Sequence, residues 1–265
     1  MSPRSTSRPR WPRSSPSSSA PSAMSDILLV HGSGYGGWCW DATIRALAAH
    51  GARARALDLP GRIFTPGLSL ADHAAAILQE IRAPVTLVGH SAGGFSIAAA
   101  AEAAPPGLIE RLVFLCAYAP RDGASVASMR RAQARQPLRP AIRLAPDRLS
   151  YSFERDLAGE ALFHDCPPEV RAAALARMGP EPVGPQEERI RLSARYHALP
   201  KHYIRCLEDR AIPPETQEAM TADWPEGSVS TLPAGHSPFL SCPEALAKRL
   251  ISVAANPLSC RPTPG

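Results

Sequence analysis

The sequence lacks the features that are typical of membrane, secreted, zinc-binding and disulfide-stabilised proteins. No apolar run approaches the ~18 residues that a membrane-spanning helix needs, and no continuous apolar stretch near the start is typical of a secretory signal. No C-x-x-C pair or Cys/His cluster suggests zinc, and a chain of 265 residues does not depend on disulfides. We therefore expect no metal and free thiols in a reducing cytoplasm for the six scattered cysteines, Cys39, Cys116, Cys166, Cys206, Cys242 and Cys260.

Acidic residues are missing from positions 1–24, where four arginines stand among Ser and Pro. This segment therefore holds most of the formal charge of +5, and the rest of the chain carries only about +1. Nucleic-acid binding by the folded body is not expected. With Trp11 as its only large apolar side chain, the segment is predicted to be disordered. The segment also resembles an organelle transit peptide, but its prolines argue against an amphipathic helix, and a functional chain that begins at Met24 is the simplest interpretation.

Continuous apolar strands alternate with amphipathic helices from Asp26 onward. Strands are predicted at 26–30, 52–59, 85–88, 112–117, 202–206 and 228–232. Helices are predicted from Asp41 as N-cap, after the capping box Ser69–Asp72, and at 95–104, 214–224 and 243–255. This order indicates an α/β fold, with a mostly parallel sheet covered on both faces.

The alternation of apolar strands and amphipathic helices is interrupted between residues 120 and 200. Prolines recur there and strands are not predicted, so we expect a helical cap over a core made of residues 25–119 and 201–256. Residues 257–265 are predicted to be a second loose end.

The heptapeptide VGHSAGG at 88–94 places Ser91 between a strand and a helix, with glycines on both sides. Gly-x-Ser-x-Gly at such a junction is the pattern of a nucleophile elbow, a turn so sharp that flanking side chains would collide. The turn would present the Ser91 hydroxyl at the carboxyl edge of the sheet. Ser91 is therefore the predicted nucleophile.

A serine nucleophile needs a base, and the base needs an acid to orient it. His236 follows the predicted strand 228–232, and Asp209 follows the strand 202–206, so both lie at the same edge of the sheet as Ser91. The chain order Ser, Asp, His matches that of α/β-hydrolases. We predict a Ser91–His236–Asp209 triad, with Glu208 and Asp122 as rival acids.

The glycine-rich loop HGSGYGG at 31–37 follows the first strand. The backbone N–H groups of Ser33, in this loop, and of Ala92, after the nucleophile, are predicted to form an oxyanion hole. A dinucleotide site is the alternative for such a loop, but the GxGxxG-plus-acid pattern is missing. His31 and His90 are expected to brace the backbone here.

Taken together, LLVHGSGYGGWCW, DLPG, VGHSAGG, CLEDRAIP and AGHSPFL resemble one branch of the α/β-hydrolase superfamily. That branch contains plant methyl esterases, salicylic-acid-binding esterases, hydroxynitrile lyases and bacterial esterases. The resemblance spans about residues 26–255 and is weakest in 120–200. It implies the same triad and oxyanion hole, no cofactor, and a serine esterase acting on small, largely apolar carboxylic esters.

Two alternatives stay open. The lyases of this branch carry a threonine in the first loop and a lysine after the catalytic histidine, where this chain has Gly32 and Ser237. Both departures favour ester hydrolysis over a hydroxynitrile-lyase-like cleavage. The other alternative is a non-enzymatic small-molecule binder with a hydrolase fold.

The substrate pocket is expected to draw on the first loop and the cap. Tyr35, Phe153 and Phe163 are the pocket candidates, although the cap aromatics are equally compatible with a packed cap core. The expected partner is a small-molecule ester, with no nucleic acid and no membrane, and a homodimer is left open.

Overall fold

The computed structural model describes residues 26–61 and 67–255. The predicted loose ends at 1–24 and 257–265, and Cys260, lie outside the described residues. The five cysteines within them are free, as predicted. Within the described ranges, none of the helices combines the length and apolar character that crossing a bilayer requires.

Six parallel strands form the central sheet in the order β2-β1-β3-β4-β8-β9. Successive residues of β1 face opposite sides, so Ile27 and Leu29 enter one apolar core while Leu28 and Val30 enter the other. The parallel, doubly covered sheet is confirmed. The strands are β1 (Asp26–Val30), β2 (Ala54–Leu57), β3 (Val85–His90), β4 (Ile109–Leu115), β8 (Lys201–Cys206) and β9 (Val229–Leu232).

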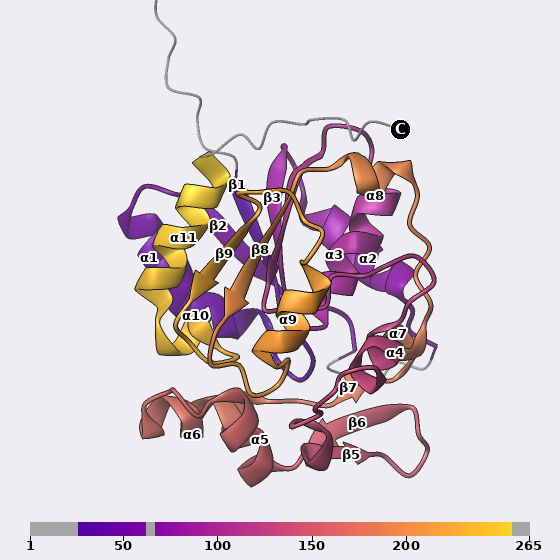
Figure 1. Cartoon of the computed structure of the whole chain (residues 1–265), viewed down its shortest axis with the longest axis vertical. Coiled ribbons are helices and arrows are strands. Elements are labelled where there is room, and N and C mark those ends of the chain that lie inside the picture. Colours follow the sequence, from indigo (N-terminus) through magenta and orange to yellow (C-terminus); the bar gives the residue numbers. More distant parts are fainter. Residues whose placement is uncertain (1–25, 62–66, 256–265) are drawn as a thin grey trace, which may run out of the picture.

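Helices cover both faces of the sheet (Figure 1). One face carries η1 (Gly37–Trp40), α1 (Asp41–Ala49), α10 (Pro238–Ser241) and α11 (Pro243–Ala255); the other carries α2 (Leu70–Glu80), α3 (Gly93–Ala103) and α8 (Ala194–Ala198). The helix α9 (Pro214–Met220) packs against β8. The Ser69–Asp72 capping box that opens α2 is present. Asp41, by contrast, begins α1 rather than capping it, because the 3₁₀ turn of η1 makes Trp40 the N-cap.

The cap differs from its prediction. Residues 120–200 contain a three-stranded antiparallel sheet as well as helices, so the expectation that strands are missing there is wrong. Its strands are only two to four residues long, too short to show a periodic pattern in the sequence. The cap elements are α4 (Val126–Arg131), η2 (Arg139–Ala141), β5 (Ile142–Leu144), β6 (Ser150–Phe153), α5 (Arg155–Leu162), α6 (Pro168–Arg177), β7 (Glu181–Pro182) and α7 (Gly184–Glu187).

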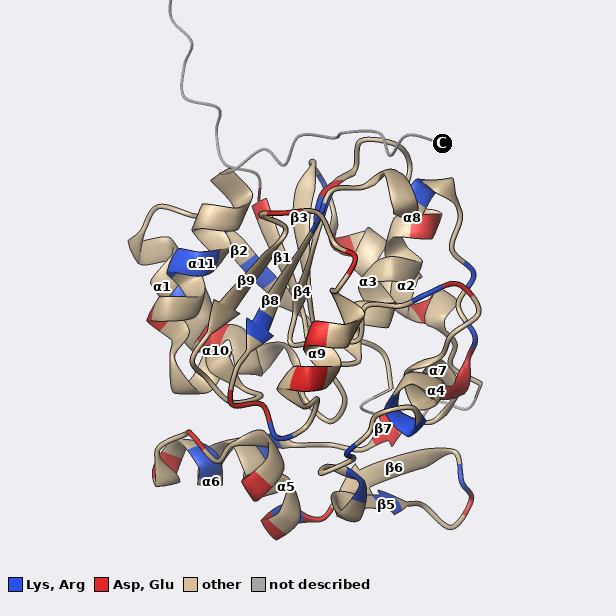
Figure 2. Ribbon diagram, viewed as in Figure 1, with Lys and Arg blue, Asp and Glu red and all other residues tan. Residues whose placement is uncertain are grey.

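The cap lies beyond the carboxyl ends of β8 and β9, at the lower edge of the molecule in Figure 1. Loops that leave the strands at this edge therefore face it, which is the usual place for the ligand site of an open α/β sheet. Acidic and basic residues are interspersed over the elements of both core and cap (Figure 2).

Candidate active site

Ser91 occupies a strained turn between β3 and α3. Its φ is +52°, a left-handed conformation that non-glycine residues seldom adopt. A Cβ on Gly89 would come within 2.7 Å of the Gly93 carbonyl, and one on Gly93 within 2.5 Å of the His31 carbonyl; one on Gly94 would collide with the Tyr118 carbonyl. The glycines are therefore required by close backbone contacts, as the elbow pattern predicts.

His236 and Asp209 form a buried pair at the same edge. The distance from His236 Nδ1 to Asp209 Oδ2 is 2.8 Å, and the two side chains are 1% and 0% exposed. Because an ionised carboxylate only accepts hydrogen bonds, Nδ1 carries the proton and donates it. Nε2, the other ring nitrogen, is not used by this bond, and both His236 and Ser91 line the same pocket.

The carboxylate of Asp209 is held from several sides. Its Oδ1 accepts the N–H groups of Ala211, at 2.7 Å, and Ile212, at 2.9 Å. Its Oδ2 accepts Gln217 Nε2 at 3.0 Å in addition to His236. Sequence reasoning did not single out Gln217, which is fully buried on α9, eight residues after Asp209.

The two rival acids lie elsewhere. The exposed Asp122 accepts the Leu192 N–H at 2.9 Å and pairs with Arg191 at 3.6 Å. Glu208 is exposed, although it adjoins Asp209 in the sequence. Of the three carboxylates, Asp209 is the one that contacts His236.

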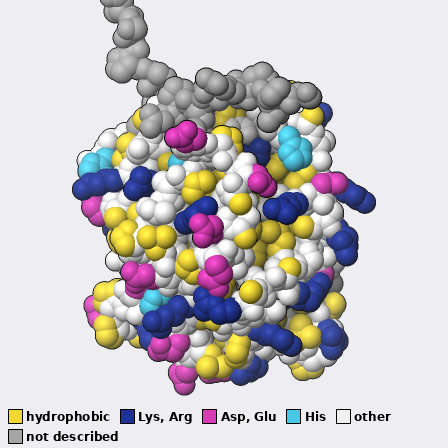
Figure 3. Space-filling view, in the orientation of Figure 1, with side chains coloured by type: hydrophobic (Ala, Val, Ile, Leu, Met, Phe, Trp, Pro, Cys, Tyr) yellow, Lys and Arg dark blue, Asp and Glu magenta, His cyan; other side chains and the backbone are white. Residues whose placement is uncertain are grey.

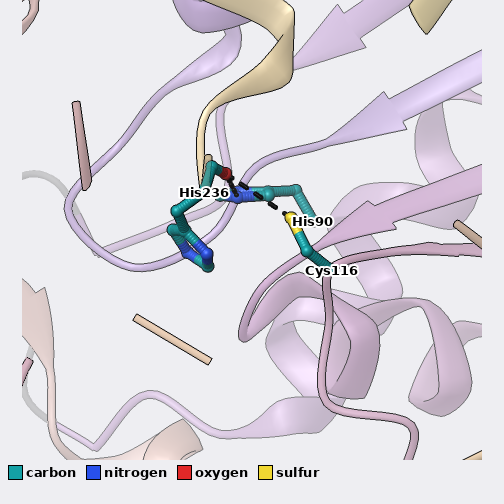
Figure 4. A group of neighbouring side chains, drawn as sticks. All are labelled: His90, Cys116 and His236. Carbon is teal, nitrogen blue, oxygen red and sulfur yellow. Dashed lines mark hydrogen bonds between the residues drawn. The ribbon is translucent and has the colours of Figure 1, made fainter. Parts of the chain in front are cut away.

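Two further side chains hold the backbone of His236. The His236 carbonyl accepts a hydrogen bond from His90 Nε2 at 2.9 Å and one from Cys116 Sγ at 3.5 Å (Figure 4). Burial lowers the pKa of His90 well below its ordinary value, so the ring is neutral and its one proton sits on Nε2. This arrangement fixes the position of His236, and it agrees with the bracing role predicted for His90.

The same three residues place their potential metal-ligating atoms within 4.8 Å of one another. The donor set does not fit a metal ion. Burial raises the pKa of the Cys116 thiol well above its ordinary value, whereas a metal binds the thiolate.

Ser33 and Ala92, the predicted oxyanion donors, both line the pocket beside Ser91. Neither N–H donates to an acceptor within the described residues. His31 braces the loop, since its Nε2 accepts the Leu59 N–H at 3.0 Å and its Nδ1 lies 2.8 Å from the Gly32 carbonyl. The N–H groups of Ser33 and Ala92 are thus not used by other acceptors of the described residues, and their role as oxyanion donors stays a prediction.

The cap also holds this loop. Gly34 donates its N–H to Glu181 Oε2 at 3.0 Å, and its carbonyl accepts the Gly179 N–H at 3.0 Å. Glu181 is buried, and its Oε1 accepts Gln186 Nε2 at 2.9 Å. Sequence reasoning missed Glu181, because an isolated Glu next to Pro182 reads as an ordinary surface residue.

Two of the three pocket candidates line the pocket. Tyr35 and Phe153 do, and the Tyr35 hydroxyl lies 2.8 Å from Ser237 Oγ. Phe163 does not: it is fully buried, with its ring 5.8 Å from that of Tyr35, and belongs to the core between cap and sheet. An aromatic side chain of the cap can either line a pocket or pack in a core, so the sequence could not show which of the two roles Phe153 and Phe163 each have.

The pocket also has a polar wall that sequence reasoning missed. Its signal in the sequence is a stretch, 123–146, that contains five arginines and no acidic residue. The polar side chains that this stretch adds to the pocket are Arg130, Gln133, Gln136 and Arg139, and Gln186 of α7 also lines the pocket.

Comparisons with known proteins agree with the hydrolase-like geometry of the site. A model of the Alpha/beta hydrolase family matches residues 27–249. Putative methylesterase 14, chloroplastic, from Arabidopsis thaliana is 31% identical over 256 residues, which cover 87% of this chain and 72% of that protein. The pyrethroid hydrolase of Sphingobium wenxiniae is 30% identical over 267 residues, which cover 91% of each chain. The cytoplasmic location of this chain stays a prediction.

A solved structure shows the same fold. The crystal structure of a pyrethroid hydrolase from Sphingobium faniae JZ-2 superposes with a TM-score of 0.76 at 27% identity. The superposition covers 88% of this chain and 98% of that one. The similarity therefore includes the cap as well as the central sheet.

Proposed function

This chain belongs to the alpha/beta hydrolase family, and from that premise we propose that it is a serine esterase that forms a covalent acyl-enzyme. The chain is a carboxylic ester hydrolase, in line with its relatives named methylesterase and pyrethroid hydrolase. The observation that carries the mechanism is the Ser91 elbow in one pocket with His236, whose Nδ1–H is fixed by the buried Asp209.

In the proposed mechanism, Ser91 Oγ attacks the ester carbonyl while His236 Nε2 accepts its proton. The N–H groups of Ser33 and Ala92 bind the oxyanion, an interaction that is worth about 10²–10³ in rate per donor in other acyl-transfer enzymes. His236 then returns the proton to the departing alcohol. Water, activated by the same imidazole, hydrolyses the acyl-enzyme.

Asp209 stabilises the imidazolium that forms on His236 in each half of the reaction. Its own hydrogen bonds from two backbone N–H groups and Gln217 hold it in place without a cation. The neutral His90 keeps the His236 backbone in register with the elbow. These contacts support a preorganised site, in which little rearrangement precedes the chemistry.

The lyase alternative is not favoured. A Cβ on Gly32 would come within 2.7 Å of Ser91 Cβ, so a threonine at this position would need the elbow to move. Ser237, at the position of the lyase lysine, is fully buried and hydrogen-bonded to Tyr35. Gly32 therefore lacks the hydroxyl, and Ser237 the cation, that cyanohydrin cleavage would use at these two positions.

A panel of p-nitrophenyl esters of increasing acyl length, run beside mandelonitrile, tests the proposal. We expect turnover of short esters and negligible cyanide release. Ser91→Ala should abolish turnover, whereas Ser241→Ala, a serine outside the pocket, should leave it unchanged. Cyanide release that rivals ester turnover at equal enzyme concentration would contradict the proposed reaction.

A further inference from the structure

The acid-free stretch 123–146 forms one wall of the pocket through α4 and η2. Two of its five arginines are neutralised by acids at the surface: Arg131 pairs with Glu187, at 3.0 Å, and Arg135 with Glu215, at 2.7 Å. A third, Arg143, donates to backbone carbonyls. The remaining two, Arg130 and Arg139, are the ones that line the pocket.

Arg130 has no acidic partner within the part of the chain that the structure describes. No carboxylate lies within 4.0 Å of its guanidinium there, and none of the residues that line the pocket is Asp or Glu. Its side chain is half-buried at the end of α4. A partly desolvated guanidinium without a counter-ion is costly, and an anion bound in the pocket would offset that cost.

Two buried tyrosines, Tyr118 and Tyr151, line the same pocket as Arg130. Burial raises the pKa of both hydroxyls, and the positive charge of Arg130 opposes that rise. Lys and Arg side chains also form a band across the lower part of the molecule, where cap meets core (Figure 3).

Neutral hydrogen-bond donors accompany this charge. Gln133 is buried and donates its Nε2 to the Tyr118 hydroxyl at 3.1 Å, and Gln136 lines the pocket beside it. The pocket also has apolar lining residues, which include Phe153, Leu162 and Ile212. The pocket thus has a reactive serine, apolar lining residues and a basic wall.

We propose that the natural substrate is an ester that carries a second, anionic group, a carboxylate in the simplest case, which Arg130 binds with Arg139 at the pocket mouth. The inference rests on the proposed ester hydrolysis and replaces the expectation of a largely apolar substrate. Ser91 forms the acyl bond as the alcohol leaves with a proton from His236, and water then releases the acid. The anionic group forms and breaks no bond and serves only to position the ester.

The test compares monomethyl esters of dicarboxylic acids, from succinate to adipate, with their dimethyl esters. We expect kcat/KM to be higher for the monoester at one chain length, by about ten- to a hundredfold, because charge-assisted hydrogen bonds contribute on that scale. Arg130→Gln should remove this preference, because it should lower kcat/KM for the monoester at least tenfold more than kcat/KM for the dimethyl ester. Arg131→Gln, the adjacent arginine paired with Glu187, should retain the preference.

Equal or better turnover of the dimethyl esters, or an equal loss for both substrates in Arg130→Gln, would overturn the inference while leaving ester hydrolysis intact. A binding measurement separates the two proposals further. By isothermal titration calorimetry, Ser91→Ala should bind glutarate, and the double variant Ser91→Ala/Arg130→Gln should bind it at least tenfold more weakly. Equal affinities for the two variants would overturn the anion site even if no ester in the panel were turned over.

Discussion

Glu181 offers a test of how the cap is joined to the first loop, because its carboxylate is buried between them. It accepts hydrogen bonds from Gly34 and Gln186 and contacts no cation within ion-pair distance in the described residues. Burial raises the pKa of Glu181 to about 7, and these two hydrogen bonds only partly oppose the rise. Ionisation of this buried carboxylate therefore lowers the stability of the folded protein.

The difference between the pKa values of Glu181 in the folded and the unfolded chain sets both the sign and the size of its effect on stability. In the unfolded chain Glu181 loses its proton near pH 4.5, whereas in the folded chain it keeps the proton up to about pH 7. Stability is therefore full below about pH 4.5 and falls as the pH rises through 7. A pKa difference of about 2.5 corresponds to a loss of about 3 kcal/mol.

Glu181→Gln removes the charge but keeps an acceptor for the Gly34 N–H. Its amide could donate to Gln186 Oε1, a buried oxygen with no partner in the described residues, after a turn of the Gln186 amide. We expect the variant to be more stable than the wild type at pH 8 by up to about 3 kcal/mol, or about 6–12 °C in Tm. At pH 5 the two should differ by less than about 1 kcal/mol.

Thermal unfolding of both proteins between pH 5 and pH 8 measures this difference. Glu226→Gln, which removes the same charge from an exposed turn, is the matched control and should leave Tm nearly unchanged at each pH. A Glu181→Gln variant that is no more stable than the wild type at pH 8, or that gains equally at pH 5, would refute the reasoning.

The remaining predictions concern the site and the elbow. Asp209→Asn should lower kcat by on the order of 10²–10⁴-fold, because the His236 tautomer is no longer fixed, while Asp122→Asn should change it less than twofold; a collapse in the second variant alone would reverse the assignment. Gly94→Ala should prevent soluble expression or lower Tm sharply, since its Cβ would collide with a backbone carbonyl; a variant with wild-type Tm would contradict this close packing. Tyr35→Phe should cost about 1–3 kcal/mol in chemical denaturation, because the buried Ser237 hydroxyl loses its partner; an unchanged midpoint would show that this bond contributes nothing.

The central sheet could be predicted because strands such as β1 and β3 are largely apolar runs and helices such as α2 begin at a recognisable cap. The Ser69–Asp72 box and the helix at 243–255 were predicted with the boundaries that the structure has. Strand ends shifted by a few residues: the predicted strand 52–59 is only Ala54–Leu57. The residues on either side of the observed strand, Arg53 and Asp58, are charged, so apolar character alone does not fix where pairing in the sheet stops.

The residues of the site also fall into those that could be predicted from the sequence and those that could not. Ser91, Asp209 and His236 follow strands of a parallel sheet, so their common edge could be inferred from order alone. Gln217 and Glu181 could not be found, because their roles depend on which side chains the folded chain brings beside them. The short cap strands pair only with one another, and nothing in their few residues distinguishes them from loops.

Covalent labelling of Ser91 tests the central claim most directly. The protein is treated with a fluorophosphonate, and the modified peptide is located by mass spectrometry beside the Ser91→Ala variant. The proposed mechanism predicts a stoichiometric adduct at Ser91, loss of esterase activity in step with labelling, and neither adduct nor activity in Ser91→Ala. An adduct at another residue, together with full esterase activity in Ser91→Ala, would contradict it.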